Sequence, residues 1–120
     1  MESISLIERL VGFETVSRDS NLPLIEFIEN YLDDHGVASR RVPSPDGKKS
    51  NLIATVGPEV EGGVVLSGHT DVVPIDGQNW SSDPFVIRQG GGRLHGRGTC
   101  DMKGFIAIAL TMVPQMKKLR

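Results

Sequence analysis

Three side chains suited to metal chemistry, His69, Asp71 and Asp101, lie within residues 63–104. A neutral imidazole and carboxylates are ligands that suit zinc, manganese or cobalt at a hydrolytic site. One carboxylate can bridge two metal ions, and a metal-bound histidine usually donates its other N–H to a carboxylate, a role open to Asp71. Two structural alternatives remain: a His-x-Asp pair is often structural, and Asp101 could simply be the N-cap of a following helix.

The apolar run Val-Val-Leu at residues 64–66 comes just before this histidine. A short, β-branched apolar run predicts a strand buried on both faces, and α/β sheets bind ligands beyond the carboxyl ends of their strands. His69 stands at that point, and Asp71 follows two residues later on the same side of an extended backbone. We therefore expect the imidazole and the carboxylate to share one site.

The remaining periodicities predict an α/β fold with a mixed sheet and flanking helices. Apolar residues at helical spacing predict helices over residues 3–13, 21–35 and 105–119. Turn residues separate two antiparallel strands, at 37–42 and 51–56, and the triple glycine at 90–92 predicts a hairpin over residues 85–95. We expect one domain without an internal boundary.

Composition and motif spacing exclude several classes of protein. The net charge of −2, without a long basic run, argues against binding to nucleic acid or a membrane surface. No apolar stretch approaches the roughly 20 residues that cross a bilayer, so the expected location is the cytoplasm. The single cysteine excludes an internal disulfide. The glycine-rich segments fail the dinucleotide and phosphate-loop patterns, and no serine lies in a Gly-x-Ser-x-Gly motif.

Three motifs in order resemble one family of enzymes. They are Ser-Gly-His-Thr-Asp-Val-Val-Pro at 67–74, Trp-Ser-Ser-Asp-Pro-Phe at 80–85, and Gly-Arg-Gly-Thr-Cys-Asp-Met-Lys-Gly at 96–104. The chain is similar to the zinc-dependent deacylases and exopeptidases, which include acetylornithine deacetylase, succinyl-diaminopimelate desuccinylase, aminoacylase and glutamate carboxypeptidase. The segments at 75–80 and 98–105 most resemble the acetylornithine deacetylases. The resemblance implies a zinc-peptidase-like catalytic domain.

The resemblance also implies roles for individual residues. His69 matches the histidine that holds one metal ion, Asp71 the catalytic carboxylate behind it, and Asp101 the aspartate that bridges two ions. The implied cofactor is zinc, two ions in the complete enzyme, with cobalt or manganese as alternatives. In the family the peptide bond after the bridging aspartate is often cis, which predicts a cis bond between residues 101 and 102.

Some features of the family have no counterpart in this sequence. The family carries a Glu-Glu pair on the next strand, the first glutamate being the general base, and later a further acidic ligand and a histidine. We therefore expect residues 1–120 to be the truncated N-terminal portion of the catalytic domain, without the dimerisation domain and without turnover. The complete protein is expected to be a homodimer.

The expected activity is metal-dependent removal of an acyl group from an N-acyl amino acid, with N-acetylornithine in arginine biosynthesis favoured. Alternatives within the family are succinyl-diaminopimelate desuccinylase and a metallo-carboxypeptidase. An alternative from another class is a truncated, non-catalytic binding module, which would use exposed sheet edges for association.

Overall fold

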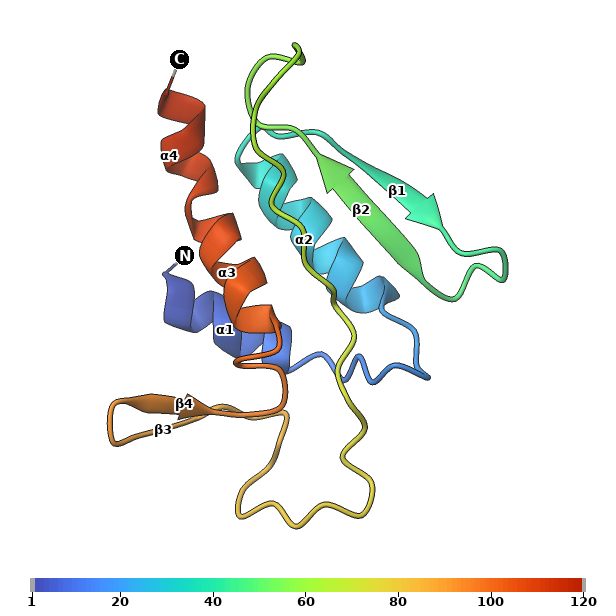
Figure 1. Cartoon of the computed structure of the whole chain (residues 1–120), viewed down its shortest axis with the longest axis vertical. Coiled ribbons are helices and arrows are strands. Elements are labelled where there is room, and N and C mark those ends of the chain that lie inside the picture. Colours follow the sequence, from blue (N-terminus) through green and yellow to red (C-terminus); the bar gives the residue numbers. More distant parts are fainter. Residues whose placement is uncertain (1, 120) are drawn as a thin grey trace.

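The computed structural model describes residues 2–119, and the α/β class predicted from the sequence is confirmed (Figure 1). In chain order the elements are helices α1 (Ser3–Val11) and α2 (Leu22–Asp34), strands β1 (Ser39–Pro43), β2 (Ser50–Ala54), β3 (Arg88–Gly90) and β4 (Arg93–His95), and helices α3 (Lys103–Thr111) and α4 (Val113–Lys118). Within residues 2–119, no helix combines the length and apolarity that crossing a bilayer requires.

The core lies between the helices. Leu6 and Leu10 repeat at helical spacing on α1, and both are fully buried, as are Leu24 of α2 and Ala107 of α3. Helices α1 and α3 pack against each other although almost the whole chain separates them in sequence (Figure 1). The predicted helices at 3–13 and 21–35 are therefore confirmed, each one or two residues shorter at its ends.

The predicted β-structure forms two antiparallel hairpins within the described residues. Strands β1 and β2 pair with Arg41 opposite Leu52, and this hairpin packs beside α2. Strands β3 and β4 pair with Gln89 opposite Leu94 across the glycine turn. A parallel bridge joins Val16 to Val72 and brings the loop between α1 and α2 against the predicted site.

The predicted strand at residues 64–66 is wrong. The segment is extended in Figure 1 but pairs with no strand within residues 2–119. Val64 and Val65 are 87% and 88% exposed, and Leu66 is 52% exposed. A strand buried on both faces needs neighbours that pair with its edges and elements that cover its faces, and the described chain supplies neither.

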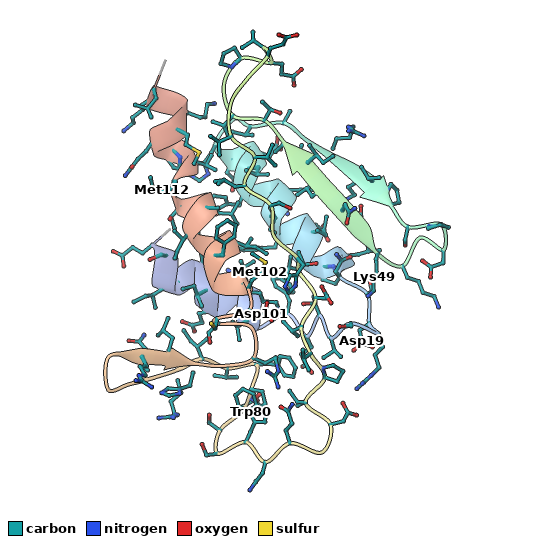
Figure 2. The ribbon with its side chains drawn as sticks, in the orientation of Figure 1. Asp19, Lys49, Trp80, Asp101, Met102 and Met112 are labelled. Carbon is teal, nitrogen blue, oxygen red and sulfur yellow. The ribbon has the colours of Figure 1, made fainter. Side chains whose placement is uncertain are left out.

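The predicted helix at 105–119 is broken into α3 and α4 at Met112 (Figure 2). Pro114 follows the break, and a proline has no N–H for the carbonyl four residues earlier and clashes with it. That carbonyl, of Leu110, accepts a hydrogen bond from the hydroxyl of Tyr31 at 3.0 Å. The side chain of Tyr31, which belongs to α2, thus gives the Leu110 carbonyl a hydrogen-bond donor at the break.

Candidate functional site

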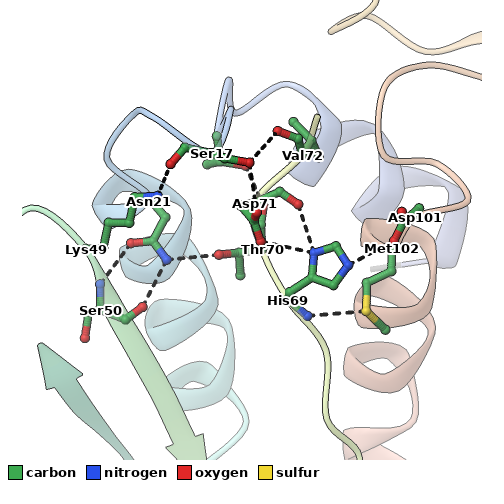
Figure 3. A network of polar contacts seen from close by, with 11 residues as sticks. Ser17, Asn21, Lys49, Ser50, His69, Thr70, Asp71, Val72, Asp101 and Met102 are labelled. Carbon is green, nitrogen blue, oxygen red and sulfur yellow. Dashed lines mark hydrogen bonds and ion pairs between the residues drawn. The ribbon is translucent and has the colours of Figure 1, made fainter. Parts of the chain in front are cut away.

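The structure brings all three predicted site residues together (Figure 3). His69 Nε2 lies 2.9 Å from Asp101 Oδ1. On the other side of the ring, His69 Nδ1 lies 2.9 Å from the carbonyl oxygen of Asp71 and 3.2 Å from its Oδ1. The imidazole is therefore held between two aspartates that come from separate segments of the chain.

Asp101 belongs to a tight turn that leads into α3. The N-cap position of α3 is Met102, so the structural alternative of Asp101 as a helix cap is not observed. The peptide bond between Asp101 and Met102 is cis, as the resemblance predicts. Gly98 has a φ of +95°, and its carbonyl accepts a 2.8 Å hydrogen bond from the N–H of Lys103. These backbone contacts define the turn that carries Asp101.

The loop between α1 and α2 holds the backbone around His69. Thr15, which is buried, donates through Oγ1 to the carbonyl of Thr70 at 2.6 Å, and its own carbonyl accepts from the N–H of Val72 at 2.9 Å. Asn21 Nδ2 donates to Thr70 Oγ1 at 2.9 Å and to the carbonyl of Ser50 at 3.0 Å. The polar side chains of this loop therefore fix the extended segment that carries the site (Figure 3).

The local electrostatics favour a charged imidazole. Desolvation lowers the pKa of His69, but hydrogen bonds to the Asp71 carbonyl and the Asp101 carboxylate, together with the charges of both aspartates, raise it above its ordinary value of 6.5. Close by, Lys103 is fully buried, and its Nζ donates to the carbonyl of Phe13 at 2.6 Å. Burial lowers the pKa of Lys103 from 10.5 to about 8.

The donor atoms of His69 and Asp101 suit a shared divalent metal ion. Zinc binds histidine nitrogen and carboxylate oxygen at about 2.0–2.2 Å in tetrahedral geometry, so two ligand atoms of one ion lie about 3.4 Å apart. Nε2 and Oδ1 lie 2.9 Å apart, a hydrogen-bond distance. A separation larger by about 0.5 Å would let both atoms bind one ion. Within residues 2–119, no three His, Cys, Asp or Glu side chains gather closely enough to hold an ion. The described residues thus supply two suitable donors, fewer than a closed site requires.

A second polar cluster lies on the long loop that follows the site segment. The guanidinium of Arg97 lies 5.2 Å from the ring centroid of Trp80, a distance typical of a cation–π contact. Trp80 Nε1 donates to Gln78 Oε1 at 2.9 Å, and Arg97 donates to the same oxygen. Trp80, labelled in Figure 2, therefore contacts a cation rather than only apolar neighbours.

Sequence reasoning missed Thr15, Ser17 and Asn21. They lie in a loop between two helices, where polar residues are common, and Asn21 is the kind of residue that caps a helix. In the structure Asn21 occupies the N-cap position of α2, but its side chain makes no capping bond. It instead makes contacts with distant segments, which no local pattern shows.

The fold is that of part of a peptidase-like catalytic domain of the α/β class. A family model described as Peptidase family M20/M25/M40 matches residues 65–120. The resemblance seen in the three motifs is thereby confirmed: residues 65–120, which carry all three, match the M20/M25/M40 peptidase family.

Curated relatives extend the similarity over most of the chain. An acetylornithine deacetylase of Pasteurella multocida (strain Pm70) is 43% identical over 102 residues, 84% of this chain and 26% of the relative. One of Proteus mirabilis (strain HI4320) is 39% identical over 114 residues, 89% of this chain and 29% of the relative. One of Yersinia pseudotuberculosis serotype O:1b (strain IP 31758) is 41% identical over 121 residues, which cover 92% of this chain and 31% of the relative. The chain thus spans about a quarter to a third of the length of these relatives.

Proposed function

We propose that the chain is part of a metal-dependent amidohydrolase that removes the acetyl group from N-acetylornithine in arginine biosynthesis. The observation that carries this proposal is the convergence of His69 Nε2 and Asp101 Oδ1 at 2.9 Å, with the Asp71 carboxylate behind the ring. Identities of 38–43% to acetylornithine deacetylases support the substrate. Zinc is the proposed metal, two ions in the complete enzyme, with cobalt or manganese as alternatives.

In this proposal the three residues have different tasks. Metal binding needs an unprotonated Nε2, so the ring proton of His69 resides on Nδ1, from which it donates to Asp71. Asp71 therefore sets the tautomer and orientation of the imidazole. Asp101 offers one oxygen beside Nε2 and a second for another ion. A bound divalent metal would polarise the amide carbonyl and lower the pKa of a water to about 7.

Residues 1–120 form, in this proposal, the N-terminal portion of the catalytic domain. The sequence has no Glu-Glu pair after α3 to supply the general base that the resemblance implies. We therefore expect no turnover by this chain alone. For the complete protein we propose a homodimer in the cytoplasm that acts on a small N-acyl amino acid, with no nucleic acid or membrane as a partner.

A non-catalytic binding module is the second candidate, and one observation favours it. Val64 and Val65 are almost fully exposed, and exposed apolar segments of this kind mark association surfaces.

Within the family, a desuccinylase or a metallo-carboxypeptidase would use the same site residues.

The test is isothermal titration calorimetry of zinc binding by the 120-residue chain. We expect the wild type to bind and both His69→Ala and Asp101→Ala to abolish binding, because each removes one of two donors. His95→Ala and Asp34→Ala serve as matched controls, since these residues lie in β4 and at the end of α2. A folded wild-type chain that binds no zinc contradicts a half-site formed by His69 and Asp101 within this chain, and binding that survives both site substitutions contradicts the proposed roles of these two residues.

Turnover is measured separately, as acetate released from N-acetylornithine with added zinc or cobalt. Metal-dependent release above background would contradict the expected inactivity of this chain.

A further inference from the structure

The Asp71 carboxylate is held from two sides (Figure 3). Its Oδ1 lies 3.2 Å from His69 Nδ1, and its Oδ2 accepts a 2.9 Å hydrogen bond from the hydroxyl of Ser17. A hydrogen bond from a hydroxyl to a carboxylate is charge-assisted and stronger than one between neutral groups. The contacts therefore form a chain from Ser17 through Asp71 and His69 to Asp101.

The position of Ser17 does not depend on its own side chain. Its N–H donates to the carbonyl of Val72 at 3.1 Å, and the N–H of Val72 donates to the carbonyl of Thr15 at 2.9 Å. These bonds form the parallel bridge between Val16 and Val72, two residues that are 5% and 2% exposed. The backbone thus places the hydroxyl beside Asp71 even before the hydroxyl makes a bond.

The hydroxyl of Ser17 has a choice of acceptors. The carbonyl of Val72 lies 3.2 Å from Oγ, whereas Asp71 Oδ2 lies at 2.9 Å and carries charge. The shorter contact to a charged oxygen is favoured. Without it, the terminal torsion of Asp71 has a broad, two-fold preference, and water can reach a carboxylate that is half exposed.

We propose that Ser17 is a positioning residue for the site: its hydroxyl orients the Asp71 carboxylate, which holds a proton on His69 Nδ1 and so leaves Nε2 free to bind a metal beside Asp101. The inference deepens the proposed function and rests on it for the metal. It differs from the roles of Thr15 and Asn21, because those residues bind the backbone and side chain of Thr70 rather than the carboxylate.

The test compares Ser17→Ala and Ser17→Thr with the wild-type 120-residue chain. Ser17 is exposed, so the alanine variant should keep its core and its unfolding midpoint. Ser17→Thr retains a hydroxyl and is the rescue variant. Ser81→Ala is the matched control, since Ser81 is an exposed serine on the long loop.

The first readout needs no metal. Long-range nitrogen–proton NMR spectra of the neutral imidazole give the fraction of His69 that carries its proton on Nδ1, with His69→Gln identifying the signals. We expect this fraction to fall in Ser17→Ala and to return in Ser17→Thr. Asp71→Asn should lower it as well, and adding Ser17→Ala to that variant should change nothing further, because the carboxylate through which Ser17 acts is gone.

The second readout is zinc affinity. Loss of a residue that orients a metal-binding histidine typically costs 10–100-fold in affinity, and for a half-exposed site we expect about tenfold for Ser17→Ala, with recovery in Ser17→Thr. Wild-type values of both tautomer and affinity in Ser17→Ala would overturn the proposal. So would an equal loss of folding stability and affinity that Ser17→Thr does not repair. A wild-type chain that binds no zinc would refute a half-site within this chain, while the tautomer comparison would still decide the role of Ser17.

Discussion

Replacing Asn21 tests how strongly one buried amide joins three segments of the chain. Its Oδ1 accepts from the N–H of Ser50 at 3.0 Å, and its Nδ2 donates to the carbonyl of Ser50 and to Thr70 Oγ1. Asn21 and Ser50 are 8% and 4% exposed, so water does not replace these bonds freely. In Asn21→Ala, both backbone groups of Ser50 lose their partner at the start of β2.

The expected cost follows from those two groups. A buried polar group left without a partner costs about 1–3 kcal/mol, so two such groups should cost about 3 kcal/mol after some relaxation. The free energy of unfolding of a small domain is about 5–15 kcal/mol. A loss of about 3 kcal/mol is therefore a large fraction of the stability of the chain. If the free energy of unfolding falls by about 1.5 kcal/mol per molar urea, the urea concentration at the unfolding midpoint should fall by about 2 M.

The assay is equilibrium unfolding in urea, followed by far-ultraviolet circular dichroism of the helices. Asn51→Ala is the matched control, because Asn51 is exposed and its side chain makes no hydrogen bond within residues 2–119. We expect a change below about 0.5 kcal/mol for the control. A loss below about 1 kcal/mol in Asn21→Ala, or equal losses in both variants, would refute the reasoning.

Three further predictions concern other parts of the fold. In Gly104→Ala the new β-carbon would overlap the carbonyl oxygen of Thr99, so thermal unfolding should show a loss of about 2 kcal/mol, and an unchanged midpoint would contradict this. Tyr31 is the only tyrosine, and burial raises its pKa above 10.0, so its absorbance titration should have a midpoint above that value. Because the unfolded chain then loses the phenolic proton first, stability should fall as the pH rises past 10, and Tyr31→Phe should remove this slope. Val65→Lys should change stability by less than about 0.5 kcal/mol and reduce light scattering at high concentration, because Val65 is 88% exposed; equal scattering would argue against this segment as the cause of association.

Local patterns predicted the elements whose partners are close in sequence. The apolar stripe of α1 and the turn-separated strands β1 and β2 carry their own spacing and turn signals. Residues 64–66 have an equally clear pattern, yet they are exposed, because burial of a strand depends on neighbours that the pattern does not describe. Pro114 was the missed local signal, since it interrupts a helix that the apolar spacing alone predicts as continuous.

The candidate site was predictable in part. His69 and Asp71 are two residues apart, so an extended backbone places them together, and the structure confirms their contact. The approach of Asp101 depends on how a turn packs against a distant segment, and only the resemblance to a family predicted it. Ser17 and Asn21 give no sequence signal, because their partners are selected by tertiary packing.

The packing of α1 against α3 has a consequence for synthesis on the ribosome. The apolar face of α1, with Leu6 and Leu10, is covered by a helix that begins at Lys103. At about 5–20 residues per second, that partner emerges roughly 5–20 s after α1. During this interval α2 can pack with the β1–β2 hairpin, whereas the face of α1 stays open to chaperones or to neighbouring nascent chains. Helix α1, whose Leu6 and Leu10 are fully buried in the folded protein, is therefore exposed for most of the synthesis of this chain.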